Sequence, residues 1–413
     1  MYLPLRLTHP INEVDCPFTH FLQIEFQFVR NPIPDRSPSL VFKLTKFYIL
    51  SQLKNKLSLY YKMSGGIAQL VAVGAQDVHL VGQPEVSFFR STYKRHTNFS
   101  QTVERQVIQG NVSNNGMSTI RFERKGDMLN YVYLVANTGS QTVAVSDWRT
   151  VISKVELLIG GQVIDEQDST YSTFIAPRTA ATSYAKCSAA DLYGGGNDEN
   201  FYPLRFAFCE NWQTALPLIS LQYHDVELRI TWGAAAADSS KKWDVYANYA
   251  YLDTQEREVF ASQPQNMLIT QVQKAVASGA KIQELNFNHP VKYLASGDAA
   301  DLAILNDNNK LKLQINGTDV SDYKFAHPNF STVPLFYHTS YGGGYQMNYP
   351  KYFFLMPFCL DTGKLQPTGT LNFSRLDSAR IINDNQDVGK DIYAVNYNVL
   401  RIENGMAGLL YSN

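Results

Sequence analysis

Apolar and polar side chains alternate along several segments of the chain, which is the pattern of a β-strand with one buried face. Apolar residues take every second position from Val226 to Trp232 and again from Trp243 to Tyr251. A polar loop from Asp238 to Lys242 separates the two segments. The pattern predicts a long antiparallel hairpin with one face in contact with water.

Two further alternating segments end in residues that favour tight turns. The segment from Val155 to Ile159 is followed by Gly160-Gly161, and the segment from Leu311 to Ile315 is followed by Asn316-Gly317. Such pairs adopt the positive φ angles of hairpin turns that match the twist of the strands. We therefore expect each segment to turn back on itself as a tight hairpin.

Little of the chain has the pattern of a helix. The stretch from Gln255 to Val272 is the main segment with helical or irregular character, and Pro264 limits any helix within it. Many short strands with turn residues between them are typical of an all-β sandwich or barrel. We place a domain boundary in this stretch, near residues 262–268.

The chain also repeats itself over a distance of about 150 residues, which is too long for a solenoid repeat and fits a duplicated domain. The segment Val155–Gly161 recurs as Leu311–Gly317, and Asp244–Ala247 recurs as Asp391–Ala394. A third pair of matches includes two triple-glycine segments: Tyr193-Gly194-Gly195-Gly196 with Asn200, Pro203 and Phe208-Cys209, and Tyr341-Gly342-Gly343-Gly344 with Asn348, Pro350 and Phe358-Cys359.

These patterns predict an all-β fold of two tandem, eight-stranded, antiparallel jelly rolls with little helix. Residues 1–62 have no repeat partner and form an N-terminal extension that is not native or is disordered. We expect translation to start at Met63, which peptides from before Met63 in the native protein would contradict. Residues 63–90 form an arm, 91–264 the first jelly roll and 265–413 the second.

Composition narrows the range of partners. The net charge is -1, so no overall field attracts nucleic acid. The basic run of Arg90, Lys94, Arg95 and His96 is interpreted as a solvated or subunit-facing patch, with a nucleic-acid contact as the alternative. The four cysteines lack metal-binding spacing, and Cys209 and Cys359 lie in apolar runs, as buried free thiols do. The other two are Cys16 and Cys187.

No motif for catalysis, metal binding or cofactor binding is found, so we predict no catalytic, metal or cofactor-binding residues and no cofactor. The triple glycines lack the strand–loop–helix setting of a phosphate loop and are interpreted as surface loops. His224-Asp225 lies on an alternating strand rather than in a nucleophile motif. The five glycosylation sequons are interpreted as chance matches, and the turn explains the one at Asn316; the others are Asn98, Asn111, Asn329 and Asn372.

Several motifs in fixed order resemble the major capsid proteins of nucleocytoplasmic large DNA viruses, such as the phycodnaviruses of algae and the iridoviruses. The resemblance runs from Met63 to Asn413. The loops of the second copy between His289 and Tyr323 are shorter than is typical of the family. We therefore assign none of the family's glycan sites to this chain. The motifs are Met63–Ala72, Gly74–Val78, Phe88–Phe99, Leu216–Leu228, Tyr251–Arg257, Leu285–Pro290, Lys292–Leu294, Leu371–Asp377, Tyr397–Ile402 and Gly405–Asn413.

The resemblance implies a structural protein of the virion, not an enzyme, with two jelly rolls side by side. Three subunits would form a homotrimer of pseudo-hexagonal outline, and such capsomers would tile an icosahedral shell over an internal membrane. The arm after Met63 would lie at the capsomer base, facing inward. The implied partners are neighbouring capsomers, minor capsid proteins, penton proteins and the internal membrane, without direct contact to nucleic acid. Assembly would occur in the host cytoplasm.

Two other functions fit an all-β chain. A jelly-roll carbohydrate-binding or cupin-like protein would carry a convergent aromatic–acidic site or a histidine-rich metal site. A minor capsid or penton protein would have a single jelly roll, which the duplication disfavours. A stable trimer would separate the capsid protein from a metal-binding monomer.

Overall fold

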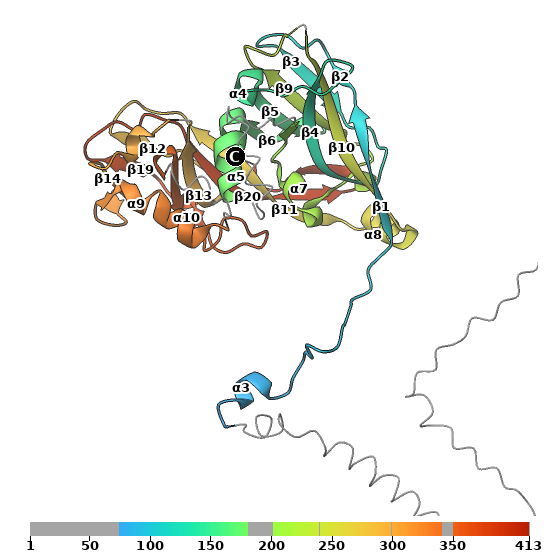
Figure 1. Ribbon diagram of the computed structural model, residues 1–413, viewed down its shortest axis with the longest axis horizontal. Helices are drawn as coiled ribbons and strands as arrows, with labels where there is room; N and C mark the ends of the chain where they lie inside the picture. Colours follow the sequence, from blue (N-terminus) through green and yellow to red (C-terminus); the bar gives the residue numbers. More distant parts are fainter. Residues whose placement is uncertain (1–73, 181–200, 239, 299, 341–349, 413) are drawn as a thin grey trace, which may run out of the picture. The chain divides into compact units, whose positions relative to one another are not determined.

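A computed structural model describes residues 74–180, 201–238, 240–298, 300–340 and 350–412 of the chain. Contacts divide the chain into two units, Met1–Lys94 and Arg95–Asn413. In the first unit, the described residues 74–94 are exposed and form one short helix, α3 (Val78–Val81). The second unit holds all the described sheets (Figure 1).

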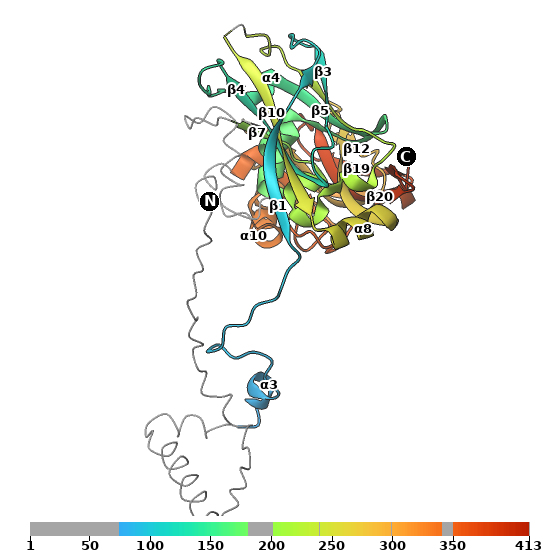
Figure 2. The same ribbon diagram turned by 90° about the vertical axis from the view of Figure 1, so that its right-hand side faces the viewer.

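The first part of the larger unit contains two antiparallel sheets. Figure 2 shows one of these sheets with its edge strand, β1 (Phe99–Gln106), in front. In that sheet the strands run in the order β1 (Phe99–Gln106), β10 (Lys242–Leu252), β4 (Met128–Asn137) and β7 (Phe201–Pro203), and β8 (Leu216–Pro217) also pairs with β4. The other sheet has the order β2 (Ile108–Gln109), β3 (Met117–Arg121), β9 (Val226–Trp232), β5 (Ile152–Ile159) and β6 (Gln162–Asp168).

The second part of the unit repeats this topology. One sheet has the order β11 (Gln265–Ala275), β20 (Ile392–Glu403), β13 (Pro290–Gly297) and β17 (Phe353–Pro357), extended by β18 (Leu371–Asn372) and β21 (Met406–Leu409). The other has the order β12 (Ile282–Glu284), β19 (Ala379–Asn383), β14 (Lys310–Ile315) and β15 (Thr318–Asp319), with β16 (Lys324–Phe325) on β14. The predicted all-β fold of two jelly rolls is confirmed.

Helices are short and lie in the connections between strands. The first roll has α4 (Trp148–Val151), the π-helix η2 (Tyr171–Ile175), α5 (Ala176–Thr179), α7 (Ala207–Glu210), η4 (Trp212–Thr214), η5 (Leu218–Ser220) and α8 (Thr254–Ser262). The second roll has η6 (Ala303–Leu305), α9 (Ala326–Asn329), α10 (Thr332–His338), η8 (Pro350–Tyr352) and η9 (Phe373–Arg375).

Both predicted tight hairpins are present. β5 pairs with β6 through Gly160 and Gly161, whose φ angles are 58° and 82°. β14 pairs with β15 through Asn316 and Gly317, whose φ angles are 50° and 79°. Two successive positive φ angles define the turn that matches strand twist.

The predicted hairpin between Val226–Trp232 and Trp243–Tyr251 is wrong. These segments are β9 and β10, and they lie in different sheets, because β9 pairs with β3 and β5 whereas β10 pairs with β1 and β4. The intervening residues cross from one sheet to the other. Alternation correctly predicted the buried face of β9, and that of β10 as far as Tyr249, but Tyr251 is exposed and Asn248, on the predicted polar face, is buried. Alternation carries no information about which strand is the neighbour.

Pro264 separates the last element of the first roll from the first strand of the second. α8 ends at Ser262, and β11 begins at Gln265. A proline disfavours the helical conformation in the residue before it, so the helix ends as its sequence predicts.

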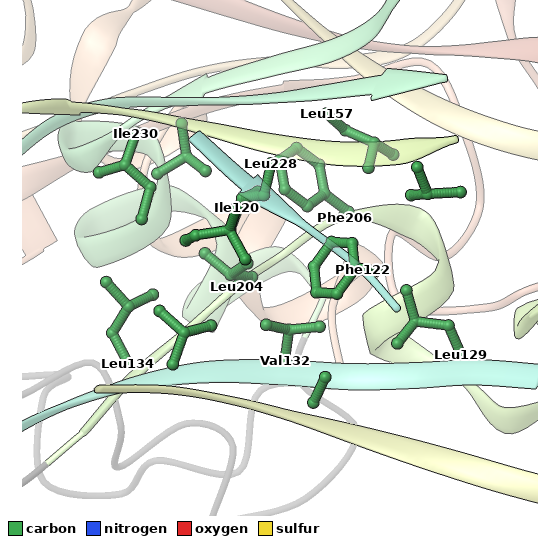
Figure 3. Close-up of a cluster of buried hydrophobic side chains, with 14 of the residues drawn as sticks. Ile120, Phe122, Leu129, Val132, Leu134, Leu157, Leu204, Phe206, Leu228 and Ile230 are labelled. Carbon is green, nitrogen blue, oxygen red and sulfur yellow. The ribbon is translucent and has the colours of Figure 1, made fainter. Parts of the chain in front are cut away.

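The core of the first roll lies between its two sheets (Figure 3). Ile120, Leu228 and Ile230 from one sheet face Leu129 and Leu134 from the other, and all five are buried. Removing each such side chain from water stabilises the fold by about 1.5–3 kcal/mol. A separate cluster of buried apolar side chains forms the core of the second roll.

Candidate assembly surfaces

The two rolls meet through one face of the sheet that contains β20, β13 and β17. Tyr293, Phe353 and Tyr393 project from this face and are each only 2% exposed. They are covered by the first roll, whose Tyr171 and Ile175 in η2 belong to the same buried cluster. Helix α5, which follows η2, lies between the rolls in Figure 1. The sheet is therefore buried on both faces.

Polar contacts align the two rolls within this interface. The Tyr293 hydroxyl donates to Thr179 Oγ1 at 2.9 Å, and Thr362 Oγ1 donates to the carbonyl oxygen of Thr179 at 2.8 Å. Lys274 Nζ lies 3.0 Å from Asp168 Oδ2 and 2.8 Å from Asp391 Oδ2. One cation of the second roll thus bridges a carboxylate from each roll.

A buried carboxyl group also lies at this interface. Asp165 Oδ1 accepts from the backbone N–H of Val272 at 2.9 Å, and its Oδ2 accepts from Gln167 Nε2 at 2.8 Å. Burial raises the pKa of Asp165 to about 7, because the desolvation of the charged form outweighs these two hydrogen bonds. Its charge therefore changes near neutral pH, at the contact between β6 and β11.

The corresponding sheet of the first roll has an aromatic outer face. Tyr133 is central: its ring centroid lies 5.5 Å from that of Tyr246 and 5.9 Å from that of Phe201. Tyr131 lies 6.3 Å from Tyr133 and 5.8 Å from Trp212. We call Tyr131, Tyr133, Phe201, Trp212 and Tyr246 the aromatic face.

The aromatic face borders a groove of about 720 Å³ between β4, β7, α7 and η4. Phe201 is 41% exposed, and Trp212 is also exposed. Large apolar side chains that gather at one exposed site are typical of a protein–protein contact. Sequence reasoning missed this surface, although Tyr131 and Tyr133 occupy alternate positions of one strand and therefore share a face.

A second exposed aromatic group lies on α10 of the second roll. Phe336 and Tyr337 are 70% and 72% exposed, with ring centroids 4.8 Å apart. The helix is held to its own roll by other groups: Pro334 is buried, and His338 Nδ1 lies 2.9 Å from the carbonyl oxygen of Cys359. The two aromatic rings are therefore fixed in position but uncovered by the described residues.

The predicted basic patch lies wholly within the described residues, as do two of the four cysteines. Arg90, Lys94, Arg95 and His96 are all exposed within their own units. Cys359 is buried and Cys209 half-buried, and burial raises the pKa of both thiols. Cys16, Cys187 and both triple-glycine segments lie outside the described residues.

The other residues singled out in the sequence have structural roles. His224 Nδ1 lies 3.0 Å from the carbonyl oxygen of Ala407, whereas Asp225 forms an ion pair with Arg121, so the two do not act on each other. Asn316 accepts from the backbone N–H groups of Asp377 and Ser378, as expected of a turn residue.

Within the part of the chain that the structure describes, no group of three or more His, Cys, Asp or Glu side chains is arranged to hold a metal ion. None of the helices described is both long and apolar enough to cross a membrane.

Comparison with known proteins identifies the family. Residues 87–262 match the family model for the N-terminus of major capsid proteins. A major capsid protein of Pyramimonas orientalis virus is 32% identical, over 85% of this chain and 100% of the relative. A major capsid protein of Paramecium bursaria Chlorella virus 1 is 30% identical over the same shares.

Solved structures agree with the sequence relatives. The quasi-atomic model of the PBCV-1 virus capsid matches with a TM-score of 0.65 and 27% identity, covering 79% of this chain and 100% of that one. The major capsid protein of Faustovirus, at 11% identity, shares the fold with a TM-score of 0.55, covering 87% of this chain and 98% of that one. The chain belongs to the major capsid protein family of large DNA viruses.

Proposed function

We propose that the chain is the main structural subunit of an icosahedral viral capsid and that it works as a homotrimer. The observation that carries the proposal is the repeated topology: two jelly rolls in one chain that matches major capsid proteins over their whole length. Three copies supply six similar domains, so a threefold ring has a nearly sixfold outline. Such capsomers fill the hexagonal positions of a shell.

The division of the chain follows from this role. Residues 91–264 form the first jelly roll and 265–413 the second, with the change at Pro264. Residues 63–90 form an arm at the base of the capsomer, facing inward, and 1–62 precede the working chain. Phe88 and Phe89 support the role of the arm, because both are fully exposed in a single chain and would gain from burial on assembly.

The proposed role is non-catalytic. The partners are other copies of the chain, minor capsid and penton proteins and an internal viral membrane, with no direct contact to nucleic acid. The net charge of -1 supports the last point, because nucleic-acid binding is driven largely by positive charge. The protein functions in the virion capsid after assembly in the host cytoplasm.

Size-exclusion chromatography with light scattering of the full chain tests the proposal. We expect a stable species with three times the subunit mass, because obligate contacts of this kind bury large areas. A monomer that binds metal or sugar would instead support the jelly-roll binding protein. Electron cryomicroscopy of the source particle would then place the trimer in the shell.

A further inference from the structure

The strand registers of the two rolls establish which residues are equivalent. Tyr246 of β10 and Tyr393 of β20 occupy the same place in the repeated segments Asp244–Ala247 and Asp391–Ala394. Tyr246 lies opposite Tyr133 of β4, and Tyr393 lies opposite Ala295 of β13. Tyr133 and Ala295 are therefore equivalent positions.

Two more equivalent pairs follow from this register. Two residues before Tyr133 and Ala295 lie Tyr131 and Tyr293. On the next strand, Pro203 of β7 lies opposite Tyr133, and Leu355 of β17 lies opposite Ala295. Two residues before these lie Phe201 and Phe353. Three aromatic side chains thus recur in the two rolls: Tyr131 with Tyr293, Phe201 with Phe353, and Tyr246 with Tyr393.

The equivalent aromatic residues differ in what covers them. In the second roll all three are buried against η2 and α5 of the first roll. In the first roll the equivalent residues belong to the aromatic face, where Phe201 is exposed and Tyr131 and Tyr246 are half-buried. The first roll therefore has the same receiving surface, but within the described residues it lacks the cover.

An ion pair beside the aromatic residues is repeated as well. Arg105 lies opposite Tyr246 in the ladder, and Lys274 lies opposite Tyr393. Arg105 Nη2 contacts Asp244 Oδ1 at 2.6 Å, just as Lys274 contacts Asp391. The similarity of the two surfaces thus includes charge as well as shape.

The helices that cover the second roll, η2 and α5, have equivalents in the second roll itself. Helices η2 and α5 follow strand β6, and helices α9 and α10 follow strand β16 at the same point of the topology. Each of α5 and α10 has a proline in its first turn, Pro177 or Pro334. Counted from that proline, Phe336 takes the place of Thr179, which contacts Tyr293 within the chain.

We propose that α10 of one copy docks on the aromatic face of a neighbouring copy of this chain, as η2 and α5 dock on the second roll within the chain. The inference deepens the proposed trimer and rests on it. The contact is head-to-tail. When each roll contacts the next roll in the same way, six rolls from three chains form a closed ring. Phe336 and Tyr337 fill the groove, because buried aromatic residues carry much of the binding energy of such contacts.

Charged substitutions on α10 test the docking surface. Phe336→Glu and Tyr337→Glu alter side chains that are mostly exposed, so each variant should fold with an unchanged circular dichroism spectrum. We expect the double variant to lose the trimer, and its mass by light scattering to fall to one third. Val320→Glu is the matched control, since Val320 is an exposed apolar residue of the same roll that follows β15 and is not part of α10.

Cross-linking tests the predicted partner of Phe336. Tyr131→Cys combined with Phe336→Cys, treated with a short bis-maleimide, should give a covalent trimer on a denaturing gel. Each single variant and the unaltered chain control for the native cysteines and should give much less product.

The outcomes separate this inference from the proposed function. If the unaltered chain is a trimer and the double Glu variant remains one, without a specific cross-link, the docking surface is wrong and the capsid role stands. An equal loss of the trimer in Val320→Glu would also overturn the inference. If the unaltered chain stays monomeric at all concentrations, the proposed trimer itself is wrong.

Discussion

Tyr393 donates its phenolic hydrogen to Asp168 Oδ2, and this bond joins the last long strand of the second roll to the end of β6 in the first. The two residues lie far apart in the sequence, yet their side chains meet at the interface between the two rolls. Burial, together with the nearby Asp168 carboxylate, raises the pKa of Tyr393, so the hydroxyl remains a donor at all physiological pH values.

Tyr393→Phe should therefore destabilise the chain. The substitution removes the donor but keeps the ring, and we expect the free energy of unfolding to fall by about 1–3 kcal/mol, because the bond involves a charged, half-buried acceptor. Urea denaturation measures the change. Tyr246→Phe is the matched control at the equivalent position of the first roll and should change the free energy of unfolding by less than about 0.5 kcal/mol.

Asp165 should make stability depend on pH. Its pKa is about 7 in the folded chain and near the ordinary aspartate value of 3.8 in the unfolded chain, so the folded state binds the proton more tightly. The contribution of Asp165 to the free energy of unfolding is therefore greatest below pH 4 and falls as the pH rises to about 7, by up to about 4 kcal/mol.

Urea midpoints at several pH values test this prediction on the full chain. Asp165→Asn should flatten the decline between pH 4 and pH 7, because the amide cannot ionise. Asp322→Asn, at an exposed site, should keep the decline. An unchanged slope in the Asp165 variant would show that another group is responsible.

Gly297→Ala should disturb the packing of the two rolls. A methyl group on Gly297 would lie 2.8 Å from Cβ of Phe174 in η2, which is too close for two carbon atoms. We expect a loss of about 1–3 kcal/mol, measured by urea denaturation. Gly389→Ala is the control, because the nearest atom to its added methyl would be 3.7 Å away; equal losses in both would contradict the steric explanation.

Asn316→Ala should weaken the hairpin of the second roll. The alanine would have to adopt a φ of 50° and would leave the N–H groups of Asp377 and Ser378 without the amide oxygen that accepts from them. We expect the midpoint of thermal unfolding to fall, with a cost of about 1–2 kcal/mol. Asn316→Asp keeps the acceptor and tolerates the same φ, so it should retain most of the stability.

Local features of the fold could be predicted from the residues. Gly160-Gly161 and Asn316-Gly317 form the predicted turns because positive φ angles depend on the residue itself. The helix ends before Pro264 because a proline disfavours the helical conformation of the residue before it. The partner of β9 could not be predicted, since alternation reports a buried face and two sheets of a jelly roll share one core.

The candidate surfaces were harder to predict than the fold. Tyr131, Phe201 and Tyr246 lie in three different strands, and only the ladder registers bring them together. Their equivalents Tyr293, Phe353 and Tyr393 look no different in sequence, although a neighbouring roll buries them. Whether an aromatic side chain is core or exposed surface depends on what packs against it, which a single strand does not encode.

The sequence by itself determined that the chain is an all-β duplication, because turns, alternation and repeated segments are properties of neighbouring residues. The capsid-protein type was indicated by the resemblance of its motifs to a known family. Only the tertiary structure decided which sheet holds each strand. It also decided that the aromatic residues of the second roll are buried by the first roll, whereas the equivalent residues of the first roll form the aromatic face. These are non-local contacts, whose energy comes from removing distant side chains from water together.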